Sequence, residues 1–364
     1  MDHRILNVGL IGLGEVAQVV HLPVLQSLPN DYRIAAICDV SPKLLQHIGQ
    51  QYRVETQNQY TDMNELVKQE DLDVVFVLNS DEYHAECAIA AANSKKHVLI
   101  EKPMCLTFAE ADAIIEARDR NGVHIMIGYM RRYAASFVEA VKEIGGLDNI
   151  TYARVRDIIG PNHYFIRPTS HTVNFNDIPE SSKEDRKLRA ERLGIEATGL
   201  QPDSPLFGFY RLLAGLGSHD LSAMREALGM PKAVLGAKLS IHKDSIFLNA
   251  IFDYGSYSVT YETGMDQQGR FDAHVEVYSS RKSVKVQYDT PYIRHLPTKL
   301  HVSETEGEAY KETVIRPTLT DPYTLELKYL HDVIIRDVAP KTTPEDSKDD
   351  LRVFEMIMEA LQAK

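Results

Sequence analysis

The chain lacks the segments that mark membrane and secreted proteins. None of its apolar runs approaches the roughly 18 residues that a membrane-spanning helix needs. Residues 1–4 lead directly into an apolar run, without the basic segment, long apolar core and small-residue cleavage site of a signal peptide. We therefore expect a cytoplasmic protein that has no membrane partner.

Cysteine is scarce, and positive charge is outweighed by negative charge. The three cysteines, Cys38, Cys87 and Cys105, have neither the even count of a disulfide framework nor the paired spacing of a zinc site. The 52 acidic residues against 40 basic ones give a formal net charge of −12, which repels a phosphate backbone. We expect no metal site, and no nucleic-acid partner.

A glycine-rich segment follows the first apolar run, residues 5–11. Its glycines let the backbone turn tightly and approach a pyrophosphate, and the helix that follows offers unpaired N–H groups to that anion. An ordinary glycine turn between a strand and a helix is the alternative. The residues that we predict to contact a dinucleotide are Gly12, Leu13, Gly14, Glu15, Val16 and Ala17.

A carboxylate stands where the ribose of such a dinucleotide would lie. The apolar run 33–38 ends at Asp39, as a βαβ unit with a ribose-binding acid requires. The carboxylate would accept hydrogen bonds from the ribose hydroxyls, and its charge would repel a 2′-phosphate. The sequence therefore predicts NAD as cofactor in preference to NADP.

The length of the chain predicts two domains, since 364 residues exceed the roughly 250–300 that one hydrophobic core usually holds. Up to residue 128, short apolar runs alternate with amphipathic segments, which predicts an α/β domain with a doubly wound parallel sheet. In that domain we expect strands at 74–78, 98–100 and 123–127, a capped helix from Thr107 to Asn121, and a kink near His21 caused by Pro23.

The second predicted domain, residues 129–364, is β-rich between residues 232 and 315, where consecutive short apolar runs predict an antiparallel sheet. A helix at 136–144 and a strand at 150–159 precede it, and a final helix is expected at about 345–361. Between them lies a polar stretch, 160–205, which we interpret as a surface lid with a short helix at 184–193. A disordered insertion is the alternative for this stretch.

Two residues are candidates for moving a proton while hydride moves to or from nicotinamide. Lys102, in Glu101-Lys102-Pro103, follows a predicted parallel strand, where open α/β sheets place their ligands, and its ammonium could stabilise an alkoxide. His219, in Gly217-Ser218-His219-Asp220, stands at an expected helix start, whose positive end would keep the imidazole neutral. Alternatively, Ser218 caps that helix and His219 is a structural residue.

These segments together resemble the glucose-fructose oxidoreductase, inositol dehydrogenase and rhizopine catabolism protein family, written Gfo/Idh/MocA. The resemblance implies a Rossmann domain, a C-terminal α/β domain with a large open, mostly antiparallel sheet, and NAD(P)-dependent redox chemistry on sugars, sugar acids or cyclic polyols. It rests on the glycine loop, Asp39, Asn79-Ser80 with His84, Glu101-Lys102-Pro103, Arg131-Arg132-Tyr133 after Gly128, and the segment of His219.

The resemblance also implies roles for single residues. Lys102 would lie at the nicotinamide and the substrate hydroxyl, His219 would transfer the proton, and Glu101 would orient Lys102 or face the cofactor. The residues implied to line the cofactor are Asn79, Ser80, which stands where a Thr-Pro pair is more usual, His84 and Arg131. The residues implied to reach the substrate are Tyr129 and Arg132, although a solvated charged turn is an alternative for the arginines.

The chain departs from the family where an acid usually precedes the histidine by four residues, because Gly215 stands there; Ser222 replaces a second acid. His163, Tyr164 or Asp203 from the lid would take the place of the missing acid, or His219 acts without it. Two other functions stay open: a sugar-sensing regulatory protein that keeps NAD binding without turnover, and NAD-dependent glycoside cleavage. The open sheet further implies a homodimer or homotetramer.

Overall fold

The computed structural model describes residues 4–363, which form two compact units. The first contains the chain up to Gly128, Ser170–Gly208 and Glu326–Leu351; the second contains Tyr129–Thr169, Phe209–Leu325 and the chain from Arg352. Ser170–Gly208 and Glu326–Leu351 thus group with the first unit, although the sequence assigns them to the second domain. The domain boundaries 1–128 and 129–364 stay a prediction.

The first unit is built on six parallel strands in the order β3-β2-β1-β4-β5-β6. The central strands are apolar and buried along almost their whole length, as parallel strands covered on both faces must be. The chain order reverses between β1 and β4, the place where such sheets open a ligand crevice. The strands are β1 (Leu6–Ile11), β2 (Tyr32–Cys38), β3 (Gln59–Tyr60), β4 (Val74–Val77), β5 (His97–Glu101) and β6 (Ile125–Gly128).

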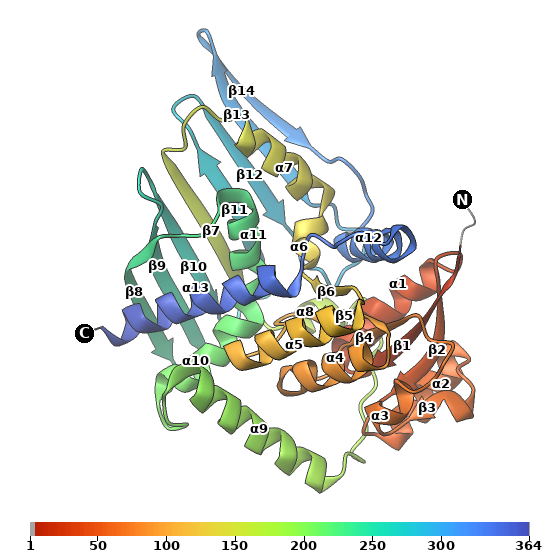
Figure 1. Cartoon of the computed structure of the whole chain (residues 1–364). Helices are drawn as coiled ribbons and strands as arrows, with labels where there is room; N and C mark the ends of the chain where they lie inside the picture. The colour runs from red at the N-terminus through yellow and green to blue at the C-terminus, as the bar shows by residue number, and fades with distance from the viewer. Residues whose placement is uncertain (1–3, 364) are drawn as a thin grey trace. The chain divides into compact units, whose positions relative to one another are not determined.

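Helices connect these strands and pack on the sheet, with α4 beside α5 (Figure 1). Helix α5 begins and ends as predicted, with a Thr107–Glu110 capping box and Gly122 in the left-handed conformation. The helices of this unit are α1 (Leu22–Ser27), α2 (Pro42–Tyr52), η2 (Thr56–Asn58), α3 (Met63–Leu66), η3 (Asp81–Tyr83), α4 (His84–Asn93), α5 (Phe108–Asn121), α9 (Glu180–Thr198) and most of α12 (Pro322–Arg336).

The expected kink near His21 takes the form of a wide turn. Residues Ala17–His21 form a π-helical turn, η1, and α1 continues directly from it with Pro23 in its first turn. Proline has no N–H to donate to the preceding turn, so the backbone there does not keep the α-helical hydrogen-bond pattern. The predicted irregularity is confirmed.

The second unit contains an eight-stranded sheet in the order β14-β13-β12-β11-β7-β10-β9-β8. Only β7 and β10 pair in parallel; the other pairs are antiparallel, as expected for the open sheet. The strands are β7 (Tyr152–Ile159), β8 (Ala233–His242), β9 (Ser245–Asp253), β10 (Ser258–Met265), β11 (Phe271–Tyr278), β12 (Lys282–Tyr288), β13 (Lys299–Glu306) and β14 (Ala309–Ile315).

Helices of the second unit cover one face of this sheet, on which alternate residues of β7 are buried. Helices α7 and α11 lie against strands β7, β11, β12 and β13. The helices are α6 (Met130–Tyr133), α7 (Ala135–Gly145), α8 (His163–Ile166), α10 (Pro205–Leu212, which begins in the first unit), η4 (Leu213–Gly217), α11 (Ser218–Leu228) and the end of α13 (Pro344–Gln362).

The lid stretch contains more helix than the sequence predicts. The helix expected at 184–193 is the middle of α9, which runs over 19 residues. Most of its positions are charged, so no apolar period marks its ends, but ion pairs one turn apart, such as Asp185–Arg189, support its exposed face. No helix within residues 4–363 is long and apolar enough to cross a bilayer.

Candidate functional site

The glycine loop has the geometry of a phosphate-binding turn. Gly12 has φ +93°, a conformation that residues with a side chain rarely adopt, and a Cβ there would lie 2.5 Å from the backbone nitrogen of Asn79. Both observations require glycine at this position. Gly14 and Glu15 are exposed, and a Cβ on Gly14 would meet nothing within 4 Å. The loop therefore offers an accessible backbone and a helix start, which fits the diphosphate of a dinucleotide.

Asp39 joins this loop to the end of β2. Its Oδ2 accepts a hydrogen bond from the N–H of Leu13 at 2.9 Å, and its Oδ1 accepts one from Ser41 at 2.9 Å. Burial raises the pKa of Asp39, and the two backbone N–H groups oppose that rise. Each carboxylate oxygen can accept a further hydrogen bond, so the site fits the two hydroxyls of a ribose.

His84 ties together the turns that follow β4 and β5. Its Nδ1 lies 2.7 Å from the carbonyl oxygen of Pro103, and its Nε2 lies 3.0 Å from that of Asn79. The ring is only 2% exposed. Asn79 itself donates from Nδ2 to the sulfur of Cys87 at 3.3 Å, and Ser80 begins η3 without capping it through its side chain. His84 thus fixes the shape of the crevice edge at which Asn79 and Ser80 lie.

Glu101 is a buried carboxylate that holds the backbone of Lys102. Its Oε2 accepts the Lys102 N–H at 3.1 Å, and its Oε1 lies 2.7 Å from Nε2 of His21. Burial opposes ionisation, but the hydrogen bond with His21 and the charges of His21 and Lys102 outweigh it and lower the pKa of Glu101. Lys102 is half-buried at the carboxyl end of β5, where ligands bind in such sheets.

Sequence reasoning missed two further groups at this edge. Gln18, on the π turn, donates from Nε2 to the carbonyl oxygen of Leu13 at 2.8 Å and so braces the glycine loop. Glu326, on α12, is fully buried, and the charge of Glu101 helps to raise its pKa. For Gln18, the predicted kink near His21 was the local hint in the sequence. Glu326 could not be found locally, because it lies more than 200 residues along the chain from Glu101 on β5.

In the second unit, His219 is the second residue of α11, but α11 continues a preceding helix, so the predicted free, positive helix end is wrong. Helix α10, the π turn η4 and helix α11 follow one another without a break, and Gly217 itself is helical, with φ −63°. Ser218 makes no capping hydrogen bond, so its predicted role as a cap is also wrong, and a structural role of His219 stays an open alternative. Gly217 resembled a helix breaker, but its missing side chain serves packing: a Cβ would lie 2.9 Å from the hydroxyl of Tyr261.

The residue after His219 belongs to a buried ion cluster. Asp220 pairs with Arg131, whose guanidinium also lies 3.0 Å from Asp157 on β7. All three side chains are almost completely buried, and Arg131 stacks over Tyr288. Burial disfavours the charge of Arg131, but the two carboxylates outweigh it and raise its pKa. The cluster fastens the first turn of α11 to the sheet and so fixes the backbone that carries His219.

The remaining candidates of the second unit fall into a buried and an exposed group. Tyr129 is 1% exposed, with the guanidinium of Arg132 over its ring, and Arg132 forms an ion pair with Glu226. His163 and Tyr164, on α8, are exposed and stack with ring centroids 4.3 Å apart.

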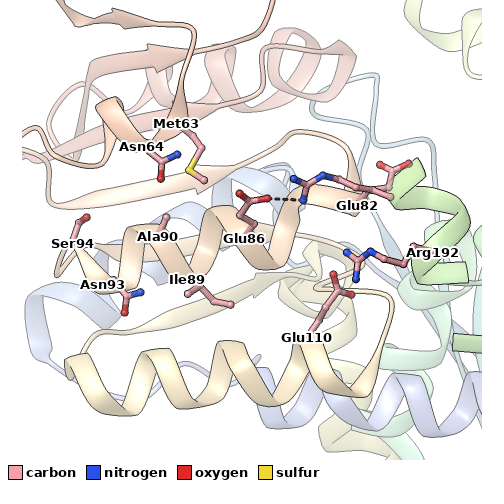
Figure 2. Close-up of a pocket in the computed structure, with 11 residues that line it drawn as sticks. Met63, Asn64, Glu82, Glu86, Ile89, Ala90, Asn93, Ser94, Glu110 and Arg192 are labelled. Atoms are coloured by element: carbon pink, nitrogen blue, oxygen red, sulfur yellow. Dashed lines mark hydrogen bonds and ion pairs between the residues drawn. The ribbon is translucent and has the colours of Figure 1, made fainter. Parts of the chain in front are cut away.

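A separate hollow lies among α4, the start of α5 and α9 (Figure 2). It has a volume of about 610 Å³, and none of the residues predicted to bind the cofactor lines it. Arg189 of α9 crosses it to Glu86 at 2.6 Å, and stacks over Tyr83. These contacts fasten α9 to α4, so we interpret the hollow as a packing groove between these two helices of the first unit and not as the cofactor site.

Known proteins are similar in sequence to the first part of this chain and similar in fold to nearly the whole chain. Residues 6–129 match the model of an oxidoreductase family with an NAD-binding Rossmann fold. Inositol 2-dehydrogenase of Salmonella typhimurium is 34% identical over 135 residues, and myo-inositol 2-dehydrogenase of Thermotoga maritima is 34% identical over 132 residues. These matches cover 37% and 36% of this chain, and only about two fifths of the length of the relatives.

The solved structures extend the likeness over nearly the whole fold. An aldose-aldose oxidoreductase from Caulobacter crescentus superposes with a TM-score of 0.73, 22% identity, and coverage of 99% of this chain and 98% of that one. A levoglucosan dehydrogenase in complex with NADH gives a TM-score of 0.74 at 18% identity, with the same coverage. With its Rossmann sheet, glycine loop and Glu-Lys-Pro turn in the places described, the segment of residues 6–129 matches the NAD-binding part of the Gfo/Idh/MocA family of oxidoreductases.

Proposed function

We propose that this protein is an NAD-dependent dehydrogenase or reductase that acts on a secondary hydroxyl or carbonyl of a sugar, sugar acid or cyclic polyol. The observation that carries the proposal is that Lys102, held through its N–H by Glu101, follows the carboxyl end of β5, on the same edge of the parallel sheet as the glycine loop after β1 and Asp39 after β2. The relatives named inositol dehydrogenases support the substrate class.

Bound nicotinamide would supply the hydride acceptor or donor. Lys102 would stabilise the negative charge that develops on the substrate oxygen, and His219 would exchange the proton of the hydroxyl. Glu101, ionised and hydrogen-bonded to the Lys102 N–H, would hold that backbone in place. Arg131 would act indirectly, because its contacts with Asp157 and Asp220 fix the turn that carries His219.

The same proposal assigns the cofactor as NAD. Asp39 directly follows β2, where a carboxylate would accept hydrogen bonds from the ribose hydroxyls of the adenosine. The exposed pair His163 and Tyr164, together with Tyr129 and Arg132, would belong to the substrate side. The particular substrate is a matter for screening.

The experiment is a comparison of Lys102→Ala with Lys187→Ala, a control on the exposed face of α9. Purified proteins are given NAD⁺ and a panel of sugars, uronates and inositols, and nicotinamide absorbance is followed. We expect Lys102→Ala to bind NAD⁺ within a few-fold of the wild type while turnover falls about 10²-fold or more. Full turnover by Lys102→Ala would refute the role of the ammonium group.

A second candidate function is a sugar-sensing protein that binds NAD without turnover, and Gly215 favours it. A Cβ at this position would meet nothing within 4 Å, so packing does not require glycine there and does not explain the missing acid. Binding of NAD⁺ and of a sugar, detected by calorimetry, with no change in absorbance for any substrate of the panel, would establish this candidate instead. NAD-dependent glycoside cleavage would be recognised by release of the aglycone.

We also propose that the protein forms a homodimer or homotetramer through the eight-stranded sheet. The face of β7 opposite α11 is half-buried and carries ion pairs from Glu262 to Arg154 at 2.9 Å and to Arg156 at 2.7 Å. This network of ion pairs, together with the exposed Leu235 on β8 and Ile251 on β9, forms a surface that a second copy of the chain could cover. Light scattering that gives the mass of one chain at micromolar concentration would contradict it.

A further inference from the structure

A strap from the lid, residues 170–178, lies on the first unit beside the glycine loop. It has no regular secondary structure, yet it is anchored at three places. One anchor is Gln18, the second is the start of α2, and the third is a ring contact between Phe175 and His47, with centroids 6.1 Å apart. A segment without helix or strand that is held in this way has a defined position on the crevice edge.

The first anchor connects the strap to the diphosphate loop. The N–H of Val173 donates to Oε1 of Gln18 at 2.8 Å, and Nε2 of Gln18 donates to the carbonyl oxygen of Val173 at 3.1 Å. The same Nε2 also donates to the carbonyl oxygen of Leu13. A single amide, 9% exposed, therefore holds the strap and the glycine loop together.

The second anchor brings another carboxylate to the ribose end of the site. Oδ1 of Asp177 accepts the hydroxyl of Ser41 at 2.5 Å, and Oδ2 accepts the N–H of Lys43 at 2.8 Å. Ser41 in turn donates its N–H to Asp39. The hydrogen bond from Ser41 lowers the pKa of Asp177, and the negative charge of Asp177 contributes to the raised pKa of Asp39.

These contacts occupy the groups that a 2′-phosphate would need. In a Rossmann domain the extra phosphate of NADP lies at the turn after β2, where it requires N–H or hydroxyl donors and positive charge. Here the hydroxyl of Ser41 and the backbone N–H of Lys43 are already used by Asp177, and a second carboxylate, Asp39, accepts the N–H of Ser41. A phosphate entering this place would meet two negative charges and would find these three donors occupied, and the Lys43 ammonium, whose charge already acts on Asp177, would have to be shared with that carboxylate.

We propose that Asp177 is a specificity-determining residue, which the strap inserts at the start of α2 so that the site accepts NAD and rejects NADP. This inference rests on the proposed function and extends it: Asp39 would bind the ribose hydroxyls, while Asp177 would block the phosphate by charge and by occupying its donors. The arrangement differs from discrimination by a single acid, because the second charge comes from a segment more than 130 residues away.

Equilibrium binding of the two cofactors tests the proposal. The dissociation constants of NAD⁺ and NADP⁺ are measured by calorimetry for the wild type, Asp177→Asn, Asp177→Lys and the control Glu184→Gln, an exposed acid of the same lid. Because like charges at close range cost several-fold to many-fold in affinity, we expect Asp177→Asn to bind NADP⁺ about tenfold more tightly than the wild type. NAD⁺ affinity should stay within about threefold.

The other variants separate charge from packing. Asp177→Lys should favour NADP⁺ further, Glu184→Gln should change neither constant, and added salt should narrow the preference of the wild type for NAD⁺. Equal losses of both affinities in Asp177→Asn would mean that Asp177 only fastens the strap, and unchanged constants would mean that it does not face the phosphate; either result overturns the inference. A wild type that binds neither cofactor would overturn the proposed function as well, whereas NAD⁺ binding with no effect of Asp177 overturns the inference alone.

Discussion

Replacing Glu326 with glutamine should stabilise the protein at alkaline pH and have much less effect in mild acid. The side chain is fully buried, and neither carboxyl oxygen has a hydrogen-bond partner within residues 4–363. Burial raises the pKa of Glu326 well above its ordinary value, the charge of Glu101 raises it further, and Lys341 opposes both effects. The folded protein therefore holds a proton on Glu326 at pH values where the unfolded chain has released it.

The sign of the pH dependence follows from that difference. Below the ordinary glutamate pKa of about 4.3, both states are protonated and the group makes no pH-dependent contribution to stability. Between that value and the folded pKa, the folded state binds more protons, so the contribution to the free energy of unfolding falls as pH rises, by up to about 1.4 kcal/mol per pH unit. Glutamine does not titrate and removes this loss.

The magnitude can be bounded and measured. From about pH 5 to about pH 8 the stability difference between Glu326→Gln and the wild type should grow in favour of the variant, with a ceiling of about 4 kcal/mol. Urea unfolding followed by circular dichroism at the two pH values gives this difference, and Glu184→Gln, on the exposed part of α9, is the matched control. A stability difference that is the same at both pH values would refute the reasoning.

Two other substitutions test the geometry of the units. Gly12→Ala should destabilise the protein by at least about 1–3 kcal/mol and weaken NAD⁺ binding about tenfold or more, because its Cβ would meet the backbone of Asn79 at a positive φ. Gly122→Ala has a positive φ but open space around the Cβ, so equal melting temperatures of the two variants would contradict the clash. Arg131→Met should cost about 3–5 kcal/mol in urea unfolding, since it leaves two buried carboxylates without their cation. Arg154→Met, on the half-exposed face, should cost about 1 kcal/mol or less, and similar losses for both arginines would be inconsistent with this account.

The sequence predicted what is encoded locally. The parallel strands ending at Ile11 and Cys38 follow from short apolar runs, and the ends of α5 follow from Thr107 and Gly122, because each of these signals acts within a few residues. The α/β fold, with one parallel and one mostly antiparallel sheet, was confirmed on that basis. Strands β13 and β14 had no individual prediction; β14 is exposed throughout and shows no buried alternation to read.

The missed parts of the candidate site depend on contacts between distant residues. Nothing in the sequence around Asp177 connects it with Ser41, 136 positions earlier, since the pairing exists only after the strap has reached the Rossmann unit. Glu326 similarly reads as an ordinary helix acid until α12 packs and buries it. The catalytic and binding roles given to individual residues stay predictions, because they require a bound cofactor or substrate to test.

The two π turns explain why α-helical spacing does not hold near His21 and near the candidate His219. A π turn inserts an extra residue into a helix, which shifts the side chains that follow by roughly 100° relative to an α-helical period. In η1 the turn ends at His21, whose ring reaches Glu101, 80 positions later on β5. In η4 the turn ends at Gly217, two residues before His219, and carries the helix on where the glycines suggested an interruption. π turns are frequent at functional sites, and here one ends at His21 and the other ends two residues before His219.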